Sequence, residues 1–161
     1  MQTTAYLSLG SNLGDRAGSL RTAIAKLGAL GEVLAVSSFY ETEPVEFIDQ
    51  PWFLNCAVAV RTELTAEQLL AGIQAIEREM GRRRIQPKGP RNIDLDILLF
   101  GDSIISTPVL EVPHPAMHRR RFVLEPLAEI GPEVRHPAFG HSVRELLQAL
   151  PSNSEQVKKV M

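Results

Sequence analysis

Two aspartates in an otherwise apolar segment are the residues of this sequence best placed to do chemistry. Asp94 and Asp96 alternate with Ile93, Leu95 and Ile97 in the run NIDLDILLF. Successive side chains of a strand point to opposite faces, so the two carboxylates would share one face, about 7 Å apart. Acidic residues are depleted in strands and two on one face repel each other, so the pair needs compensation. A bound divalent cation supplies it; a solvated strand face is the alternative.

A run of positive charge stands directly before the two aspartates. Residues 82–91 contain four arginines and one lysine, together with Pro87, Gly89 and Pro90. Several guanidinium groups on one loop can close over phosphate oxygens, so loop and carboxylates together predict a site for Mg²⁺ and a polyphosphate. A solvated loop and a nucleic-acid contact are the alternatives. The second would favour a pattern of stacking aromatics like that of the RNP motifs, which neither the loop nor the following strand contains, and the chain has no Walker A or GxGxxG motif.

A second cationic cluster follows later in the chain. His114 stands between two prolines, which fixes its direction, and His118 precedes three consecutive arginines and Phe122. No spaced partner pattern accompanies the histidines, so metal ligation by them is disfavoured. We expect His114 and one of the arginines to contact phosphate; a structural role is the alternative for His114.

An amide and aromatic side chains are available for a flat ring. Asn55 lies among apolar residues of an expected strand, where its amide needs a partner from the backbone or a ligand. Phe53 and Phe122 could enclose the ring of such a ligand. The residue types alone leave a ring-binding role and a structural role for Asn55 equally open.

The expected elements place these residues on one framework. The pattern predicts strands at Thr3–Leu9, Glu32–Glu43, Phe53–Thr62 and around Asp94–Phe100, with a turn at Gly10–Asn12. Helices are expected after an N-cap at Asp15, closing near Gly31, and after a capping box at Thr65 and Gln68. The order βαββαβ is that of a ferredoxin-like α/β sandwich (α+β), a mostly antiparallel sheet with helices on one face. Further helices are expected at Met117–Ile130, bent or split at Pro126, and at Ser142–Leu150, with fraying from Ser152 onward.

Composition bounds the class of protein. The 161 residues, 44% hydrophobic and 22% charged, predict a single globular domain spanning 1–161. A net charge of −2 gives no overall attraction to nucleic acid or to an anionic membrane. The single cysteine, Cys56, excludes a disulfide framework and is expected in the core. We expect a cytoplasmic, monomeric protein that acts on small molecules and binds neither nucleic acid nor membrane.

Four ordered motifs resemble the 6-hydroxymethyl-7,8-dihydropterin pyrophosphokinase family of folate biosynthesis. They are SLGSNLGD, SSFYETEPV with DQPWFLN, GRRR with GPRNIDLDILLFG, and VPHPAMHRRRFVLEPLAEI. The resemblance covers nearly the whole chain and implies transfer of the β,γ-pyrophosphoryl unit of ATP to the pterin hydroxymethyl group, with release of AMP. The sequence departs from the family at Lys88, where an aromatic residue is usual, and at Glu46 and Phe47, where the loop is usually richer in glycine.

The resemblance also implies roles for individual residues. Asp94 and Asp96 match the ligands of two Mg²⁺ ions, and with Arg82 and Arg91 they form the expected catalytic set. The residues that match the ATP site are Leu70, Gln74, Glu77, Arg82, Arg84, Arg91, Ile97, His114 and Arg120. The residues that match the pterin site are Thr42, Val45, Phe53, Asn55, Asp94 and Phe122.

Two other functions stay open on the sequence alone. One is a different Mg-dependent nucleotide phosphoryltransferase, such as a γ-phosphoryl kinase or a nucleotidyltransferase, which would release ADP or pyrophosphate in place of AMP. The other is a non-catalytic ferredoxin-like module that binds a nucleotide or RNA without turnover.

Overall fold

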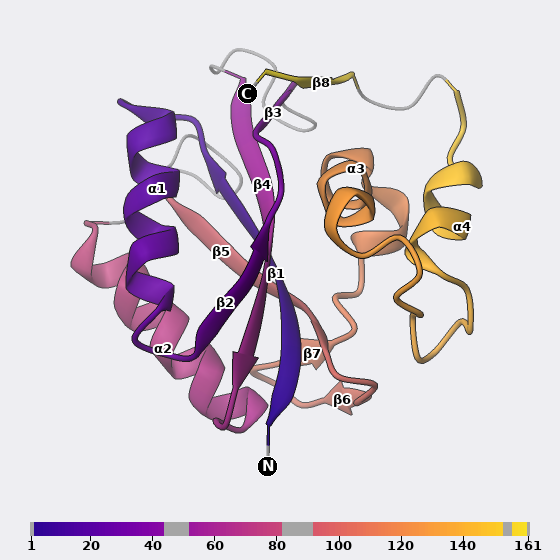
Figure 1. Cartoon of the computed structure of the whole chain (residues 1–161), viewed down its shortest axis with the longest axis horizontal. Helices are drawn as coiled ribbons and strands as arrows, with labels where there is room; N and C mark the ends of the chain where they lie inside the picture. The colour runs from indigo at the N-terminus through magenta and orange to yellow at the C-terminus, as the bar shows by residue number, and fades with distance from the viewer. Residues whose placement is uncertain (1, 44–51, 82–91, 153–155, 161) are drawn as a thin grey trace.

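A computed structural model describes residues 2–43, 52–81, 92–152 and 156–160. Its centre is one β-sheet (Figure 1). Six of the described strands form this sheet in the order β5-β1-β4-β3-β8, with β2 also paired to β4, and every pair is antiparallel. In chain order the elements are β1 (Thr3–Ser11), α1 (Arg16–Leu27), β2 (Glu32–Val36), β3 (Tyr40–Thr42), β4 (Phe53–Thr62), α2 (Ala66–Glu79), β5 (Asp94–Phe100), β6 (Ile105–Ser106), β7 (Glu111–Val112), the 3-10 helix η1 (Met117–Arg119), α3 (Arg121–Ile130), α4 (Val143–Gln148) and β8 (Val157–Lys159).

The first two helices begin where the sequence predicts them. The Asp15 side chain accepts the N–H of Gly18 at the start of α1, and Thr65 forms a capping box with Gln68 at the start of α2. Such caps satisfy backbone donors that lack a partner in the first helical turn. The end of α1 differs slightly from the prediction: the helix stops at Leu27, before Gly31.

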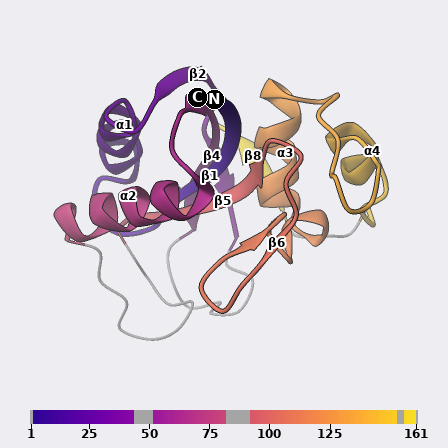
Figure 2. The ribbon, with the colours of Figure 1, turned by 90° about the horizontal axis from the view of Figure 1, so that it is seen from below.

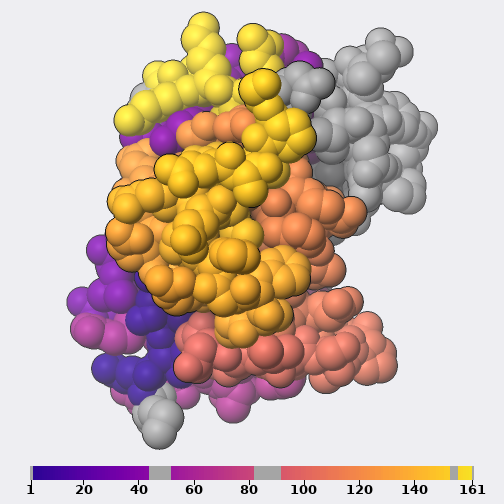
Figure 3. Space-filling model, turned by 90° about the vertical axis from the view of Figure 1, so that its right-hand side faces the viewer, coloured from indigo at the N-terminus to yellow at the C-terminus, as the bar shows by residue number. Residues whose placement is uncertain are grey.

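The two helices of the ferredoxin-like core, α1 and α2, lie on one face of the sheet as expected, and the additional C-terminal helices cover the other face (Figures 1 and 2). α1 and α2 pack on one face over a core that includes Leu7, Leu9 and Cys56. α3 and α4 pack on the other face over a second core. Their residues cover the centre of that side of the molecule in Figure 3. The second layer forms because α3 and α4 carry apolar side chains of their own that must be buried.

The strands depart from prediction at three places. β1 continues through Gly10 to Ser11 instead of turning, because both residues pair with β4. The expected strand 32–43 is divided into β2 and β3 at Ser37, whose Oγ accepts the N–H of Ala57. The expected fraying after Ser152 is wrong for Val157–Lys159, which pair with β3 as β8. A strand edge offers unpaired backbone groups, and β8 satisfies those of β3.

The long helix expected at 117–130 is split, but not at Pro126. η1 and α3 are separated by the extended residue Arg120, whereas Pro126 lies buried inside α3. β5 also contains an irregularity: Tyr6 pairs with Leu99 and Leu7 with Ile97, so Leu98 is an extra residue, a β-bulge. The ferredoxin-like order of the first six expected elements is otherwise confirmed, with β6 and β7 added as a small hairpin.

Candidate active site

The two aspartates lie at the beginning of β5, on the face opposite to the α1 and α2 helices. Asp94 pairs with Gly10 and Asp96 with Ser8, and both side chains are half-buried. Leu95 and Ile97, between and after them, are 4% exposed and belong to the α1/α2 core. The alternation predicted from the sequence is therefore confirmed.

A row of paired residues joins the aspartates to the expected ring-binding residues. Gly10 pairs with Asp94 on one side and with Asn55 on the other, so the three lie side by side across β5, β1 and β4. Directly paired residues of antiparallel strands share a face. Asn55 therefore faces the same side as Asp94. Phe53, two residues earlier, and its partner Thr42 lie on this face too.

Two buried polar atoms in this group have no hydrogen-bond partner among the described residues. They are Oγ1 of Thr42, which is 2% exposed, and Oδ1 of Asn55, which is 4% exposed. The other amide atom of Asn55, Nδ2, donates a long hydrogen bond of 3.5 Å to the Leu9 carbonyl. Leaving a buried polar atom unsatisfied costs about 1–3 kcal/mol. Such atoms on one face of a sheet are what a polar ligand would satisfy.

His114, in the segment before α3, lies close enough to Asp94 and to Arg120 to feel the charge of both. The backbone N–H of His114 donates to the carbonyl of Leu98 at 3.0 Å, which fixes this segment to β5. Burial, and then the charge of Arg120, lower the pKa of His114 to about 4, against an opposing effect of Asp94. His114 is therefore neutral at physiological pH. Its Nδ1 accepts the N–H of Ala116 at 3.1 Å, so its proton lies on Nε2, which can donate to an oxyanion.

The guanidinium of Arg120 lies against an aromatic ring. Its Cζ is 5.5 Å from the centroid of Phe122, a cation–π contact. Phe122, expected to enclose the ring of the substrate, is half-buried in the first turn of α3. The structure thus brings an expected phosphate-binding side chain and an expected ring-binding side chain into contact.

The α2 residues take different positions. Glu77 Oε2 accepts the backbone N–H of Leu95 at 2.8 Å, between the two aspartates. This contact was not predicted, because no sequence pattern relates a helix carboxylate to the peptide of a distant strand. Gln74 is exposed, Leu70 packs partly against the α1/α2 core and Ile97 is buried in that core. Arg82, Arg84, Arg91 and Val45, with Glu46, Phe47 and Lys88, lie outside the described residues.

A metal would have two protein ligands here. Within the part of the chain that the structure describes, no group of three or more His, Cys, Asp and Glu side chains could hold a metal. Mg²⁺ is held in many phosphate-transfer sites by one or two carboxylates together with substrate phosphates and water. The half-buried carboxylates of Asp94 and Asp96, on one strand face, suit that mode of binding.

A separate pocket of about 540 Å³ lies at the sheet edge beside α1. It is lined by Arg16, Glu41, Trp52, Gln156 and Lys158. Arg16 bonds both the Glu41 carboxylate and the Trp52 carbonyl at 2.9 Å. Glu41 alternates with Thr42 in β3, so its side chain faces away from the aspartate row. The chemistry described above does not use this pocket.

Fold and site together define the chain as a ferredoxin-like α/β sandwich with a carboxylate pair on its sheet. The chain belongs to the 7,8-dihydro-6-hydroxymethylpterin-pyrophosphokinase (HPPK) family, whose model matches residues 6–132. The same fold occurs in Plasmodium falciparum HPPK-DHPS, with a TM-score of 0.74 and 19% identity over 92% of this chain and 43% of that one. No helix among the described residues is long and apolar enough to cross a membrane.

Curated relatives of two lengths match the chain. It is 51% identical to the 2-amino-4-hydroxy-6-hydroxymethyldihydropteridine pyrophosphokinase of Bacillus subtilis, over 86% of this chain and 84% of the relative. It is 45% identical to the protein of the same name from Methylorubrum extorquens, over 97% and 99%. It is 44% identical to the folic acid synthesis protein fol1 of Schizosaccharomyces pombe over 92% of this chain, but it spans only 20% of that protein's length.

Proposed function

We propose that this protein transfers pyrophosphate from ATP to the hydroxymethyl group of 6-hydroxymethyl-7,8-dihydropterin, giving AMP and the pterin diphosphate for tetrahydrofolate synthesis. Family membership supports the reaction class, since the family uses ATP as co-substrate. The observation that carries the proposal is the row Asp94–Gly10–Asn55, which sets a carboxylate beside an unsatisfied buried amide. A flat heterocycle with ring N–H groups at one end and a reacting hydroxyl at the other would fit such a row.

Asp94 and Asp96 would hold Mg²⁺, with two ions shared between these carboxylates and the triphosphate. The bound ions would neutralise the phosphate charge and align the reacting groups. The half-buried position of the carboxylates supports this role, because it leaves one side open to ligands. A single carboxylate exposed on the protein surface would bind such ions only weakly.

The phosphates would be gripped by cations and by one neutral donor. Arg82, Arg84, Arg91 and Arg120 are the proposed cations. His114 would donate from Nε2, because its pKa of about 4 keeps it neutral and its Nδ1 is already engaged. Leu70, Gln74, Glu77 and Ile97 are proposed near the rest of the nucleotide, and Glu77 would also hold the β5 backbone in place.

The ring would be read by polar groups and enclosed by aromatic ones. Asn55 Oδ1 would accept a hydrogen bond from a ring N–H, and the Thr42 hydroxyl would satisfy a second ring atom. Val45 is proposed at the same end, and Phe53 and Phe122 would lie against the faces of the ring. The arrangement would direct the hydroxymethyl group towards Asp94.

In the proposed reaction the substrate hydroxyl oxygen attacks the β-phosphorus of ATP. A bond forms between these atoms, the bond from the β-phosphorus to the oxygen bridging the α-phosphate breaks, and AMP leaves. The hydroxyl proton passes to solvent or to a phosphate oxygen. None of the proposed catalytic residues is a strong base, which is consistent with catalysis by positioning and charge stabilisation.

The nucleotide product tests the proposal. The protein is incubated with ATP, Mg²⁺ and the reduced hydroxymethyl pterin, and the nucleotides are separated. AMP in a one-to-one ratio with the pterin diphosphate is expected. ADP would indicate a γ-phosphoryl kinase, pyrophosphate would indicate a nucleotidyltransferase, and binding without turnover would indicate a non-catalytic module.

We further propose that the chain acts as one cytoplasmic, monomeric unit spanning residues 1–161. Its similarity to the Methylorubrum extorquens pyrophosphokinase along nearly the whole of both chains supports a single functional unit. A sedimentation experiment at micromolar concentration would test this, and a species of twice the mass would contradict the monomer.

A further inference from the structure

Gly10 belongs to the SLGSNLGD motif and lies in the middle of the row Asp94–Gly10–Asn55. It is buried in β1, the strand between the aspartates of β5 and the ring-binding residues of β4. Its two cross-strand partners are Asp94 and Asn55. Neighbouring strands are about 4.8 Å apart, so Gly10 lies midway along a span of about 10 Å between these two residues.

A side chain at Gly10 would collide with the Asn55 amide. An ideal Cβ built on Gly10 lies 2.7 Å from Asn55 Nδ2 and 3.7 Å from Phe53 Cδ1. The first distance is below the 3.0 Å that real Cβ contacts essentially never cross. The Asn55 amide therefore lies across the backbone of Gly10, in space that only glycine leaves open.

Asn55 has little freedom to move away from such a side chain. It is 4% exposed, its Nδ2 reaches the Leu9 carbonyl, and Tyr40 is its partner on the other flanking strand. A displaced amide would lose the direction of Oδ1, the acceptor that lacks a partner among the described residues. A change at Gly10 would thus be felt first by the group proposed to read the ring.

The close contacts at two other glycines, both half-buried, have structural explanations. A Cβ at Gly31 would meet the Arg61 carbonyl at 2.4 Å, and one at Gly72 would meet the Leu30 side chain at 2.6 Å. Both serve close packing between elements. At Gly10 the nearest neighbour is instead the polar end of a side chain on the ligand-binding face.

We infer that Gly10 is a positioning residue that determines specificity. Because it has no side chain, the Asn55 amide can lie flat on the sheet, and the surface of the sheet between that amide and Asp94 stays open to a ligand. The ligand recognised by this arrangement is a planar heterocycle with N–H donors on one edge. The inference rests on the proposed pterin site and adds the residue that shapes it.

The test is Gly10→Ala, with steady-state kinetics for both substrates and thermal denaturation. We expect the KM for 6-hydroxymethyl-7,8-dihydropterin to rise about tenfold or more, since a misdirected hydrogen bond to a ligand costs about that factor. The KM for ATP should change less than about twofold, because the nucleotide does not depend on Asn55. Gly28→Ala is the control, at the exposed end of α1, where an added Cβ meets only the Ala25 carbonyl at 3.3 Å.

A double-mutant cycle with Asn55→Ala separates positioning from general damage. In the Asn55→Ala background the clash is absent, so Gly10→Ala should change the pterin KM by less than about threefold. Equal effects in both backgrounds, or parallel rises in both KM values, would overturn the inference. An Asn55→Ala variant with an unchanged pterin KM would overturn the proposed pterin site itself. A normal Asn55→Ala loss with a silent Gly10→Ala would overturn the role of Gly10 alone.

Discussion

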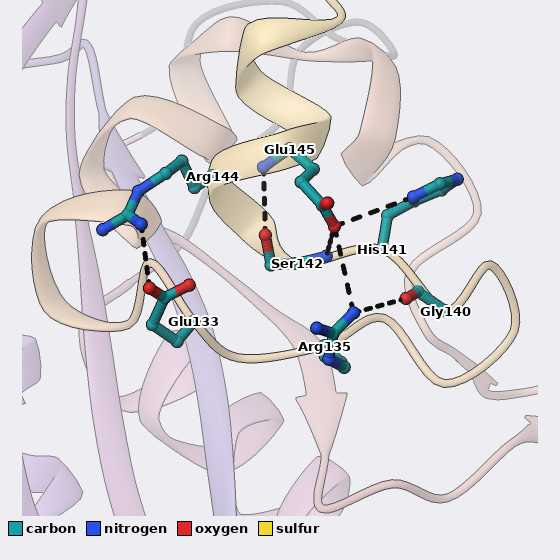
Figure 4. A network of polar contacts seen from close by, with 7 residues as sticks. All are labelled: Glu133, Arg135, Gly140, His141, Ser142, Arg144 and Glu145. Carbon is teal, nitrogen blue, oxygen red and sulfur yellow. Dashed lines mark hydrogen bonds and ion pairs between the residues drawn. The ribbon is translucent and has the colours of Figure 1, made fainter.

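Two polar regions of this molecule contrast in how their hydrogen bonds are satisfied. Around α4, Ser142 and Glu145 exchange hydrogen bonds in a capping box, and Glu145 lies near Arg135 and His141 (Figure 4). On the sheet face, Thr42 and Asn55 each keep a buried polar atom without a partner among the described residues. The polar groups around α4 are hydrogen-bonded or paired with one another, whereas the unpartnered atoms of Thr42 and Asn55 are available to a ligand. A buried polar atom that lacks a partner within the fold therefore indicates a ligand site better than a dense polar cluster does.

The largest expected effect is on the carboxylates of the sheet face. Asp94→Asn and Asp96→Asn should each lower kcat by roughly a hundredfold or more, since each removes a charge proposed to bind Mg²⁺. Both variants should stay folded, because each carboxylate is only half-buried and an amide has nearly the same shape. Kinetics at saturating Mg²⁺ and calorimetry measure the two quantities. Asp102→Asn, in the exposed turn after β5, is the matched control; near-normal turnover in either variant would contradict the metal assignment.

Two buried threonines test the contrast directly. Thr42→Val removes an unsatisfied hydroxyl, so the protein should become more stable by about 1 kcal/mol while the KM for the pterin rises. Thr62 is its control, because Thr62 Oγ1 donates to the Leu30 carbonyl at 2.7 Å and accepts the Leu64 N–H at 3.1 Å. Thr62→Val should lose about 1–2 kcal/mol of unfolding free energy with no change in KM. The same sign of stability change in both variants would mean that the hydroxyls of Thr42 and Thr62 do not differ in how well they are satisfied.

A hydrogen-bonded carboxylate on α3 gives a smaller, pH-dependent effect. Glu129 accepts from the Tyr40 hydroxyl at 2.7 Å and from the N–H of Ser38 at 2.9 Å. Burial alone would raise the pKa of the Glu129 carboxyl, but these hydrogen bonds outweigh it, so the pKa lies below its ordinary value. The stabilisation is therefore complete above the ordinary carboxyl pKa and is lost as the pH falls through the lowered one.

Glu129→Gln should cost about 1.5 kcal/mol of unfolding free energy at pH 7. The difference from the unmodified protein should shrink on acidification, because the carboxyl then becomes neutral in both folded and unfolded states. Urea denaturation at a series of pH values measures it. A difference that stays constant down to pH 2 would show that the charge of Glu129 contributes nothing.

The smallest expected effect belongs to the α4 network. Ser142→Ala removes the side chain that accepts the Glu145 N–H at 3.1 Å, and such caps contribute about 1 kcal/mol. We expect a small fall in melting temperature and unchanged KM values for both substrates. A changed KM for either substrate would mean that this surface network communicates with the sheet face, and the distinction between the two regions would then fail.

The sequence predicts the local features of this fold well and the long-range ones poorly. The caps at Asp15 and Thr65 and the alternation at Asp94 depend on neighbours in the chain, so local rules find them. The register that sets Gly10 between Asp94 and Asn55 depends on strands that are distant in sequence. The Glu77 contact with Leu95 and the pairing of β8 are of the same kind. The resemblance to a family supplied the grouping of residues that periodicity could not.

The bulge at Leu98 allows one strand, β5, to contribute both to the ligand-binding face and to the second core. Before it, β5 directs Asp94 and Asp96 to the ligand-binding face in strict alternation; after it, Leu98 and Leu99, 1% and 0% exposed, both enter the second core. The inserted residue thus shifts the alternation of side chains by one position, between the part of β5 that carries the aspartates and the part that is buried in the second core. Leu98 also offers its carbonyl to His114. The bulged residue thus also fixes the segment that precedes α3.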